Sequence, residues 1–162
     1  MPSAADLLLP VAFVAALGCG VLAGLFFVFS NTVMTALGRR PPNEAAAAMQ
    51  AINAVILNPA FLGLFVGTAV ACLVVAAAAL AGGHPFLLGG AVLYLAGGLG
   101  VTAAANVPLN NRLERLGPGP EAAACWGDYA RRWTRWNHVR TGACLAAAAS
   151  LTLGLYRLGA GA

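Results

Sequence analysis

The chain alternates between long apolar runs and shorter polar segments. Four of the runs are apolar over about 20 residues or more, the length that an α-helix needs to cross the hydrocarbon core of a bilayer. They cover residues 7–30, 59–82, 86–107 and 136–157. Because only helices and closed barrels satisfy their backbone groups in lipid, the pattern predicts an all-α fold. We expect a polytopic bundle of four transmembrane helices that forms a single integral membrane domain over residues 1–162.

The segment between the first and second runs has the pattern of an amphipathic helix. Pro41 and Pro42 interrupt the chain, and Asn43 is the expected N-cap of a helix that runs to about Leu57. One side of this helix carries an apolar stripe that a single amide, Asn53, interrupts. No cap or turn requires this amide, so Asn53 is a candidate functional residue.

Two further breaks divide the chain. Asn58 and Pro59 fit a cap and a first-turn proline at the start of the second span. After the stop at residues 117–120, residues 121–129 resume a helical pattern. Short amphipathic helices are therefore expected in both of the longer loops.

The first span contains two glycines, Gly20 and Gly24, at a spacing that lets helix backbones approach closely. At about 100° per residue, Phe27 and Asn31 share the face of these glycines. We expect this face to pack inside the bundle, where Asn31 would enter near one end. The glycines are also compatible with a homo-oligomer.

Composition and charge agree with a membrane protein and indicate its orientation. Hydrophobic residues make up 60% of the chain and charged residues 9%, against about 25% charged in soluble domains. All nine basic residues are arginines; seven lie in the two long loops, and Arg157 lies near the C-terminal end. Because short basic loops stay cytoplasmic, we expect a multi-pass protein of the cell membrane with both termini outside and both arginine-rich loops in the cytoplasm.

The net charge of +4 follows from this topology. We therefore expect membrane lipids as partners and no nucleic acid, whose recognition requires a basic face on a soluble fold.

The stretch RRWTRWNHVRT, residues 131–141, divides into two faces on a helical wheel. The outer face carries Arg131, Arg135 and His138. The inner face carries Trp133, Asn137, Arg140 and Cys144. The outer face fits an anchor at the depth of the lipid headgroups. An arginine inside a span is costly and is a candidate for function, the alternative being that Arg140 only ties loop ends together.

Polar side chains in or near the spans concentrate at one end of the expected bundle. The candidate site residues are Asn53, Asn106, Asn110, Trp133, Asn137 and Arg140. The amides and the arginine of this set, together with Asn31, map to the expected cytoplasmic ends of their helices, whereas the outer ends carry almost no polar side chains. Two interpretations remain: amides that only link helices, at about 0.6 kcal/mol each, or a pocket whose few polar groups orient a mostly apolar ligand.

Several kinds of site lack the residues they need. The only histidines, His84 and His138, fall on opposite membrane sides, so they cannot share a metal or hold a haem. The four cysteines form no C-x-x-C pair and are expected to be packing residues. No Asp or Glu lies inside a span, as a proton-coupled exporter would require. We therefore expect no metal and no evident cofactor.

Three motifs, in this order along the chain, together resemble one family. They are Asn53-x4-Asn58-Pro59-x-Phe61, Asn106-Val107-Pro108-Leu109-Asn110 and Trp126-x2-Tyr129-x3-Trp133-x3-Asn137-x-Val139-Arg140-Thr141. The chain resembles, over nearly its whole length, a family of small four-helix membrane proteins. The few members with an assigned activity are anthrone oxygenases of aromatic polyketide pathways.

The resemblance implies a pocket for a lipophilic phenolic or polycyclic aromatic molecule. Its residues would be Asn106, Asn110, Trp133, Asn137 and Arg140. There, Arg140 and the amides would stabilise an anthrone-type enolate that reacts with oxygen to give an anthraquinone, without a conventional organic cofactor. No residue stands out as a general base, since His138 lies on the outer face. The alternative is a non-catalytic membrane protein that binds a lipophilic ligand or serves as a subunit of a larger complex.

Overall fold

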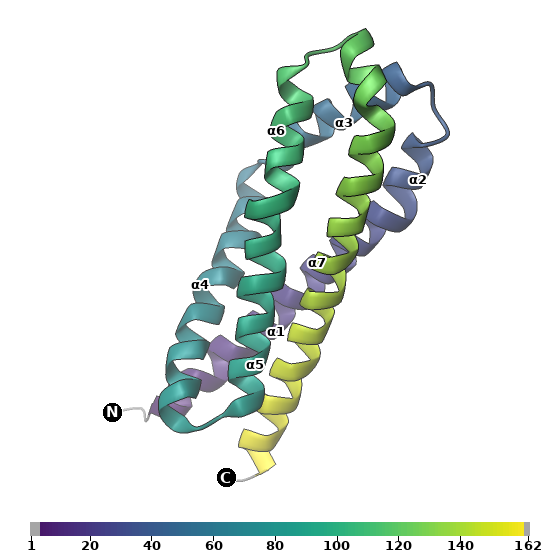
Figure 1. The fold of residues 1–162 in the computed structure, drawn as a ribbon. Helices are drawn as coiled ribbons and strands as arrows, with labels where there is room; N and C mark the ends of the chain where they lie inside the picture. Colours follow the sequence, from purple (N-terminus) through teal and green to yellow (C-terminus); the bar gives the residue numbers. More distant parts are fainter. Residues whose placement is uncertain (1–3, 161–162) are drawn as a thin grey trace.

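The computed structural model describes residues 4–160, with side chains from Leu8 to Ala160. Within this part of the chain every element is a helix, and no β-strand is present. Four long helices lie side by side, and one shorter helix crosses one end of the bundle (Figure 1). The expected all-α fold with four long apolar helices is confirmed.

The first and third long helices contain π-helical segments. The first consists of α1 (Ala4–Val28), the π-helix η1 (Phe29–Val33) and α2 (Met34–Leu37). The third consists of α5 (Pro85–Leu93), the π-helices η2 (Tyr94–Gly100) and η3 (Thr102–Asn106), and α6 (Val107–Arg115). The second and fourth are regular: α4 (Pro59–Gly82) and α7 (Pro120–Ala160).

Each long helix is apolar and long enough to cross a membrane, and three of them extend beyond the expected spans. The third reaches Arg115 and the fourth begins at Pro120, so only residues 116–119 connect them. The amphipathic segments expected in this loop are therefore not separate helices but the ends of α6 and α7. The backbone needs no break there, because its hydrogen bonds stay within the helix whether the side chains meet lipid or water.

The expected amphipathic helix of the first loop is α3 (Pro42–Ile56). Its start differs from the expectation: Pro41 occupies the N-cap position, and Asn43 lies in the first turn without capping it. Pro42 at the first helical position has no N–H to satisfy and a φ suited to a helix, which lowers the need for a side-chain cap. The expected cap of α4 is confirmed, since Asn58 Oδ1 accepts the backbone N–H three residues later at 3.0 Å.

The two ends of the bundle differ in their connections. α1 begins and α7 ends at the end that also holds the α4–α5 turn, at the bottom of Figure 1. In this turn Gly83 adopts a φ of 70°, which glycine tolerates without steric cost, and its N–H donates to Ala79 O. We call this end the turn end and the opposite one the α3 end.

The face of α1 that packs against the other helices is not the expected one. Gly20, Gly24, Phe27 and Asn31 are exposed, and a Cβ placed on either glycine would have no neighbour within 4 Å. The buried side of α1 and η1 instead carries Cys19, Leu22, Ala23, Phe26 and Ser30. The prediction was wrong because every side of this span is apolar, so its pattern does not separate a lipid-facing side from a protein-facing one.

The interior contains two clusters of buried side chains. The central cluster joins α1, α4, η2 and α7 around Tyr94, and it includes three cysteines, Cys19, Cys72 and Cys144. These thiols are free, in agreement with a packing role. The second cluster packs α3 onto α6 and α7 at the α3 end, chiefly through Met49 and stacked aromatic rings whose centres are 5.7 Å apart, Trp126 and Tyr129.

Candidate functional site

A cavity of about 90 Å³ lies near the α3 end, and we call it the Arg140 cavity. Residues of α1, η1, α3, α4, η3, α6 and α7 line it, most of them apolar. Its polar lining consists of Asn53, Thr102, Asn106, Asn110, Trp133 and Arg140. The structure thus brings five of the six candidate residues to one cavity. The sixth, Asn137, is fully buried behind Arg140.

Two π-helical segments contribute to this region. η1 carries Phe29 and Ser30, and η3 carries Thr102 and Asn106. A π-turn contains one more residue than an α-turn, which widens the helix and changes the direction of its side chains, and such turns are frequent at functional sites. Pro108 follows η3 by two residues and has no backbone N–H to donate, so the irregular backbone expected there takes the form of a π-helix rather than a break.

Arg140 is the only buried arginine among the described residues, with 6% of its surface exposed. Its guanidinium donates to Thr102 Oγ1 at 3.1 Å and to Asn137 Oδ1. Its Cζ lies 4.1 Å from the centre of the Phe26 ring and 5.4 Å from that of Trp133. Aromatic faces attract a cation, but all of these partners are uncharged.

No carboxylate in the described part of the chain neutralises Arg140. The ion pairs found there join exposed side chains: Arg40 with Glu44, and Asp128 with Arg131 and Arg132. A buried cation without a counter-ion is costly, and an anionic ligand beside it would reduce that cost. The bonding partners of Arg140 belong to helices rather than loops, which argues against a role in tying loop ends together.

Asn137 holds Arg140 in place. Its Nδ2 donates to Phe26 O and to Ser30 Oγ, both at 2.6 Å. Because a backbone carbonyl can only accept, this contact fixes the orientation of the amide and turns Oδ1 toward Arg140. Ser30 therefore takes the place expected for Asn31, its neighbour in the sequence, which faces outward.

Four buried side-chain nitrogen and oxygen atoms of the described residues have no hydrogen-bond partner, and all four belong to residues that line the cavity. They are Asn53 Nδ2, Asn106 Oδ1, Trp133 Nε1 and Arg140 Nε. A buried polar group without a partner costs about 1–3 kcal/mol. The N–H groups of Trp133 and Arg140 can only donate, so a ligand that satisfies them must present acceptor oxygen atoms.

Two further amides, Asn106 and Asn110, form hydrogen bonds with α7. Asn106 Nδ2 donates to Trp133 O at 3.3 Å, and the Tyr129 hydroxyl donates to Asn110 Oδ1 at 2.9 Å. Tyr129 was not among the candidates, although it precedes Trp133 by one helical turn and so shares its face. Thr102 and Phe26 were also absent from the candidate set, since their contacts with Arg140 depend on how separate helices are placed.

The two faces expected for residues 131–141 are confirmed. Trp133, Asn137, Arg140 and Cys144 are buried, whereas Arg131, Arg135 and His138 are exposed. His138 therefore does not reach the cavity. Within the described part of the chain, no group of three or more His, Cys, Asp or Glu side chains could hold a metal ion. By its chemistry, this lining can hold a mostly apolar ligand and stabilise an oxyanion at one edge of it.

Comparison with known proteins gives one family match. The family model described as anthrone oxygenase matches residues 54–150, more than half of the 162 residues. The matched range includes Asn106, Asn110, Trp133, Asn137 and Arg140 and begins one residue after Asn53. No curated protein and no solved structure gives a match.

Proposed function

The chain belongs to the anthrone oxygenase family, and on this premise we propose that it is an integral membrane oxygenase. Its substrate would be a lipophilic phenolic or polycyclic aromatic compound bound in the Arg140 cavity. One observation carries the proposal: the buried, unneutralised Arg140 and its neighbour Trp133 each have an N–H group without a partner at the cavity.

The proposed reaction begins with an aromatic ring ketone that carries an acidic CH2 group, as in an anthrone. Loss of one proton from this carbon gives an enolate whose negative charge rests mainly on oxygen. In this proposal the partnerless N–H groups of Arg140 and Trp133 stabilise that oxyanion, and Asn137 holds the guanidinium in position. Arg140 thereby increases the acidity of the bound CH2 group, and the released proton passes to the surrounding water.

The enolate carbon then donates electrons to O2 and forms a C–O bond. Loss of water from the resulting hydroperoxide leaves a ketone. In sum, CH2 and O2 become C=O and H2O, and the electrons for reducing O2 come from the substrate carbon. The proposed reaction requires no organic cofactor.

The size and position of the cavity set conditions for the ligand. A volume of about 90 Å³ is smaller than the ~150 Å³ that accommodates benzene. A polycyclic ligand therefore requires that side chains or α3 move outward. Two lining residues, Leu57 and Val107, are 64% and 40% exposed. In a bilayer they would face lipid, which supports entry of a lipophilic substrate from the membrane.

The test measures conversion of emodin anthrone to emodin, together with oxygen uptake, in membranes that contain the protein. Arg140→Gln should lower both rates at least tenfold. Arg157→Gln is the matched control, because Arg157 also stacks on a phenylalanine, 4.5 Å from the ring centre of Phe86, but lies at the turn end. This control should keep the wild-type rates.

Equal rates in the wild type and Arg140→Gln, both at the background of spontaneous oxidation, would contradict an oxygenase. Identification of the molecules that co-purify then distinguishes between the two forms of the non-catalytic alternative. An unchanged lipophilic ligand bound by the wild type would favour a binding protein, and a co-purified protein would favour a subunit of a larger complex.

A further inference from the structure

A second hollow lies on the outer surface of α7, away from the Arg140 cavity. This groove has a volume of about 410 Å³ and is lined by Arg132, Arg135, Trp136 and Val139. The four residues follow a spacing of three or four, so they form one continuous stripe on the helix. None of them lines the Arg140 cavity.

The stripe changes in character along the helix axis. It begins with two arginines, continues with a half-exposed tryptophan, and ends with a half-exposed valine. From Arg132 to Val139 the helix rises by roughly 10 Å. This exceeds the headgroup layer of one leaflet, which is about 5–8 Å thick. The arginines can therefore lie at headgroup depth while Val139 lies in hydrocarbon, with Trp136 at the boundary where tryptophan is preferred.

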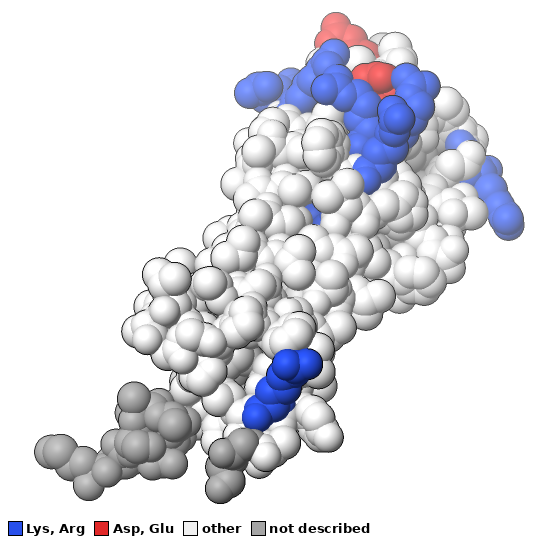
Figure 2. All heavy atoms as spheres, turned by 60° about the horizontal axis from the view of Figure 1, so that its bottom comes forward, with Lys and Arg blue, Asp and Glu red and all other residues white. Residues whose placement is uncertain are grey.

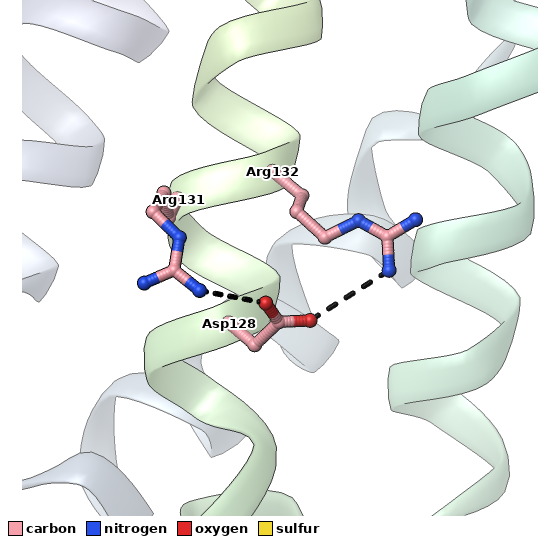
Figure 3. Close-up of polar contacts among 3 residues, drawn as sticks. All are labelled: Asp128, Arg131 and Arg132. Atoms are coloured by element: carbon pink, nitrogen blue, oxygen red, sulfur yellow. Dashed lines mark hydrogen bonds and ion pairs between the residues drawn. The ribbon is translucent and has the colours of Figure 1, made fainter.

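The groove carries excess positive charge. Asp128 is the carboxylate nearest to it, and it lies 2.8 Å from Arg131 and 3.7 Å from Arg132 (Figure 3). Arg131 and Arg132 extend to opposite sides of Asp128, and Arg135 forms no ion pair within the described part of the chain. The single carboxylate here thus pairs with two of the three arginines and leaves Arg135 without a counter-ion among the described residues. Most of the basic side chains gather at the α3 end, as Figure 2 shows.

The surface below the groove suits a hydrocarbon chain. Gly142 follows Val139 by three residues, and a Cβ placed on it would meet nothing within 4 Å. The next residue, Ala143, packs closely against η2. A Cβ placed on Gly97 of η2 would lie 2.3 Å from the Cβ of Ala143. Gly142 therefore continues the stripe as an open surface on α7, whereas η2 packs against Ala143 beside it.

We propose that this groove binds one anionic phospholipid. The lipid phosphate pairs with Arg132 and Arg135, the glycerol region lies against Trp136, and an acyl chain follows Val139 and Gly142. Charge selects the headgroup, since two guanidinium groups favour a net negative lipid over a zwitterionic one.

The test uses protein purified in detergent and offered equal amounts of phosphatidylglycerol and phosphatidylcholine, with bound lipid counted by native mass spectrometry. The wild type should retain one phosphatidylglycerol, and the double variant Arg132→Gln/Arg135→Gln should retain at least tenfold less. The matched control is Arg39→Gln/Arg40→Gln, which removes the same charge from the other arginine-rich loop and should bind as the wild type does.

Gly142→Leu provides a test that leaves the charge unchanged. The Cβ of this leucine meets nothing within 4 Å, and its side chain would occupy the proposed path of the acyl chain, so phosphatidylglycerol retention should fall at least fivefold. Equal loss in the two double variants would show attraction by general charge and overturn the site. Retention without preference between the lipids, or full retention in Gly142→Leu, would overturn it as well.

Discussion

At the scale of single residues, Trp133 offers the sharpest test of the proposed oxyanion site. Trp133→Phe keeps an aromatic ring beside Phe29, whose centre is 5.9 Å away, and removes only the Nε1–H group. If that group binds the developing oxyanion, kcat/KM for emodin anthrone should fall about tenfold, which corresponds to ~1.4 kcal/mol. The measurement is the initial rate of quinone formation at several substrate concentrations.

Trp126→Phe is the control for this substitution. Trp126 belongs to the same aromatic cluster but does not line the Arg140 cavity. Its replacement should leave kcat/KM within twofold of the wild type. Equal effects of the two substitutions would mean that packing, and not the N–H group, explains the loss.

Predictions for single residues succeeded where they depended on the geometry of one helix alone. The wheel separated Arg140 from Arg135 correctly, because side chains on one helix keep fixed relative directions. It could not identify Thr102 or Phe26 as partners of Arg140, because those contacts depend on the placement of other helices. Ser30 was missed because a different face of the first span, the one that carries Asn31, was expected to pack inside the bundle.

At the scale of helices, replacing a glycine by alanine should have opposite effects on stability in the third and first spans. A Cβ on Gly90 of α5 would lie 2.9 Å from Ala147 O and 3.0 Å from Leu151 N, both backbone atoms of α7. Gly90→Ala should therefore destabilise the bundle by about 1–3 kcal/mol, the usual cost of overpacking. Gly20→Ala meets nothing and should raise stability by up to about 1 kcal/mol through helix propensity.

Thermal unfolding in detergent, followed by circular dichroism, measures both glycine variants. The melting temperature should fall for Gly90→Ala and stay level or rise for Gly20→Ala. A marked fall for Gly20→Ala, accompanied by a change of oligomeric state, would show that this exposed face of α1 packs against another copy and would contradict the prediction.

The long helices could be predicted from the sequence more fully than their ends. The apolar runs located all four, since length and hydropathy suffice for a spanning helix. They did not show that α7 extends over Pro120–Ala160, because its polar first part resembles a loop although the backbone continues unchanged. The π-turns beside the cavity were beyond prediction, since they result from packing as well as from residues such as Pro108.

At the scale of the whole molecule, the distribution of arginines predicts orientation. Those of the two arginine-rich loops lie at the α3 end, where most of the basic side chains gather (Figure 2). Arg157 lies in the last turn of α7, near the turn end. Because basic segments resist translocation, the α3 end should face the cytoplasm and the two termini the opposite side. The Arg140 cavity would then lie toward the cytoplasmic surface, where an intracellular enzyme can supply its substrate.

Two reporters in a bacterial host test this orientation. Alkaline phosphatase, active only outside the cytoplasm, should be active when fused to the C-terminus, and a green fluorescent protein fused there should stay dark. The same fluorescent protein inserted after Gly117, in the short connection between α6 and α7, should fluoresce. A fluorescent C-terminal fusion with a dark insertion would reverse the orientation. The cavity would then face away from the cytoplasm, and its substrate would have to cross the membrane or arise outside.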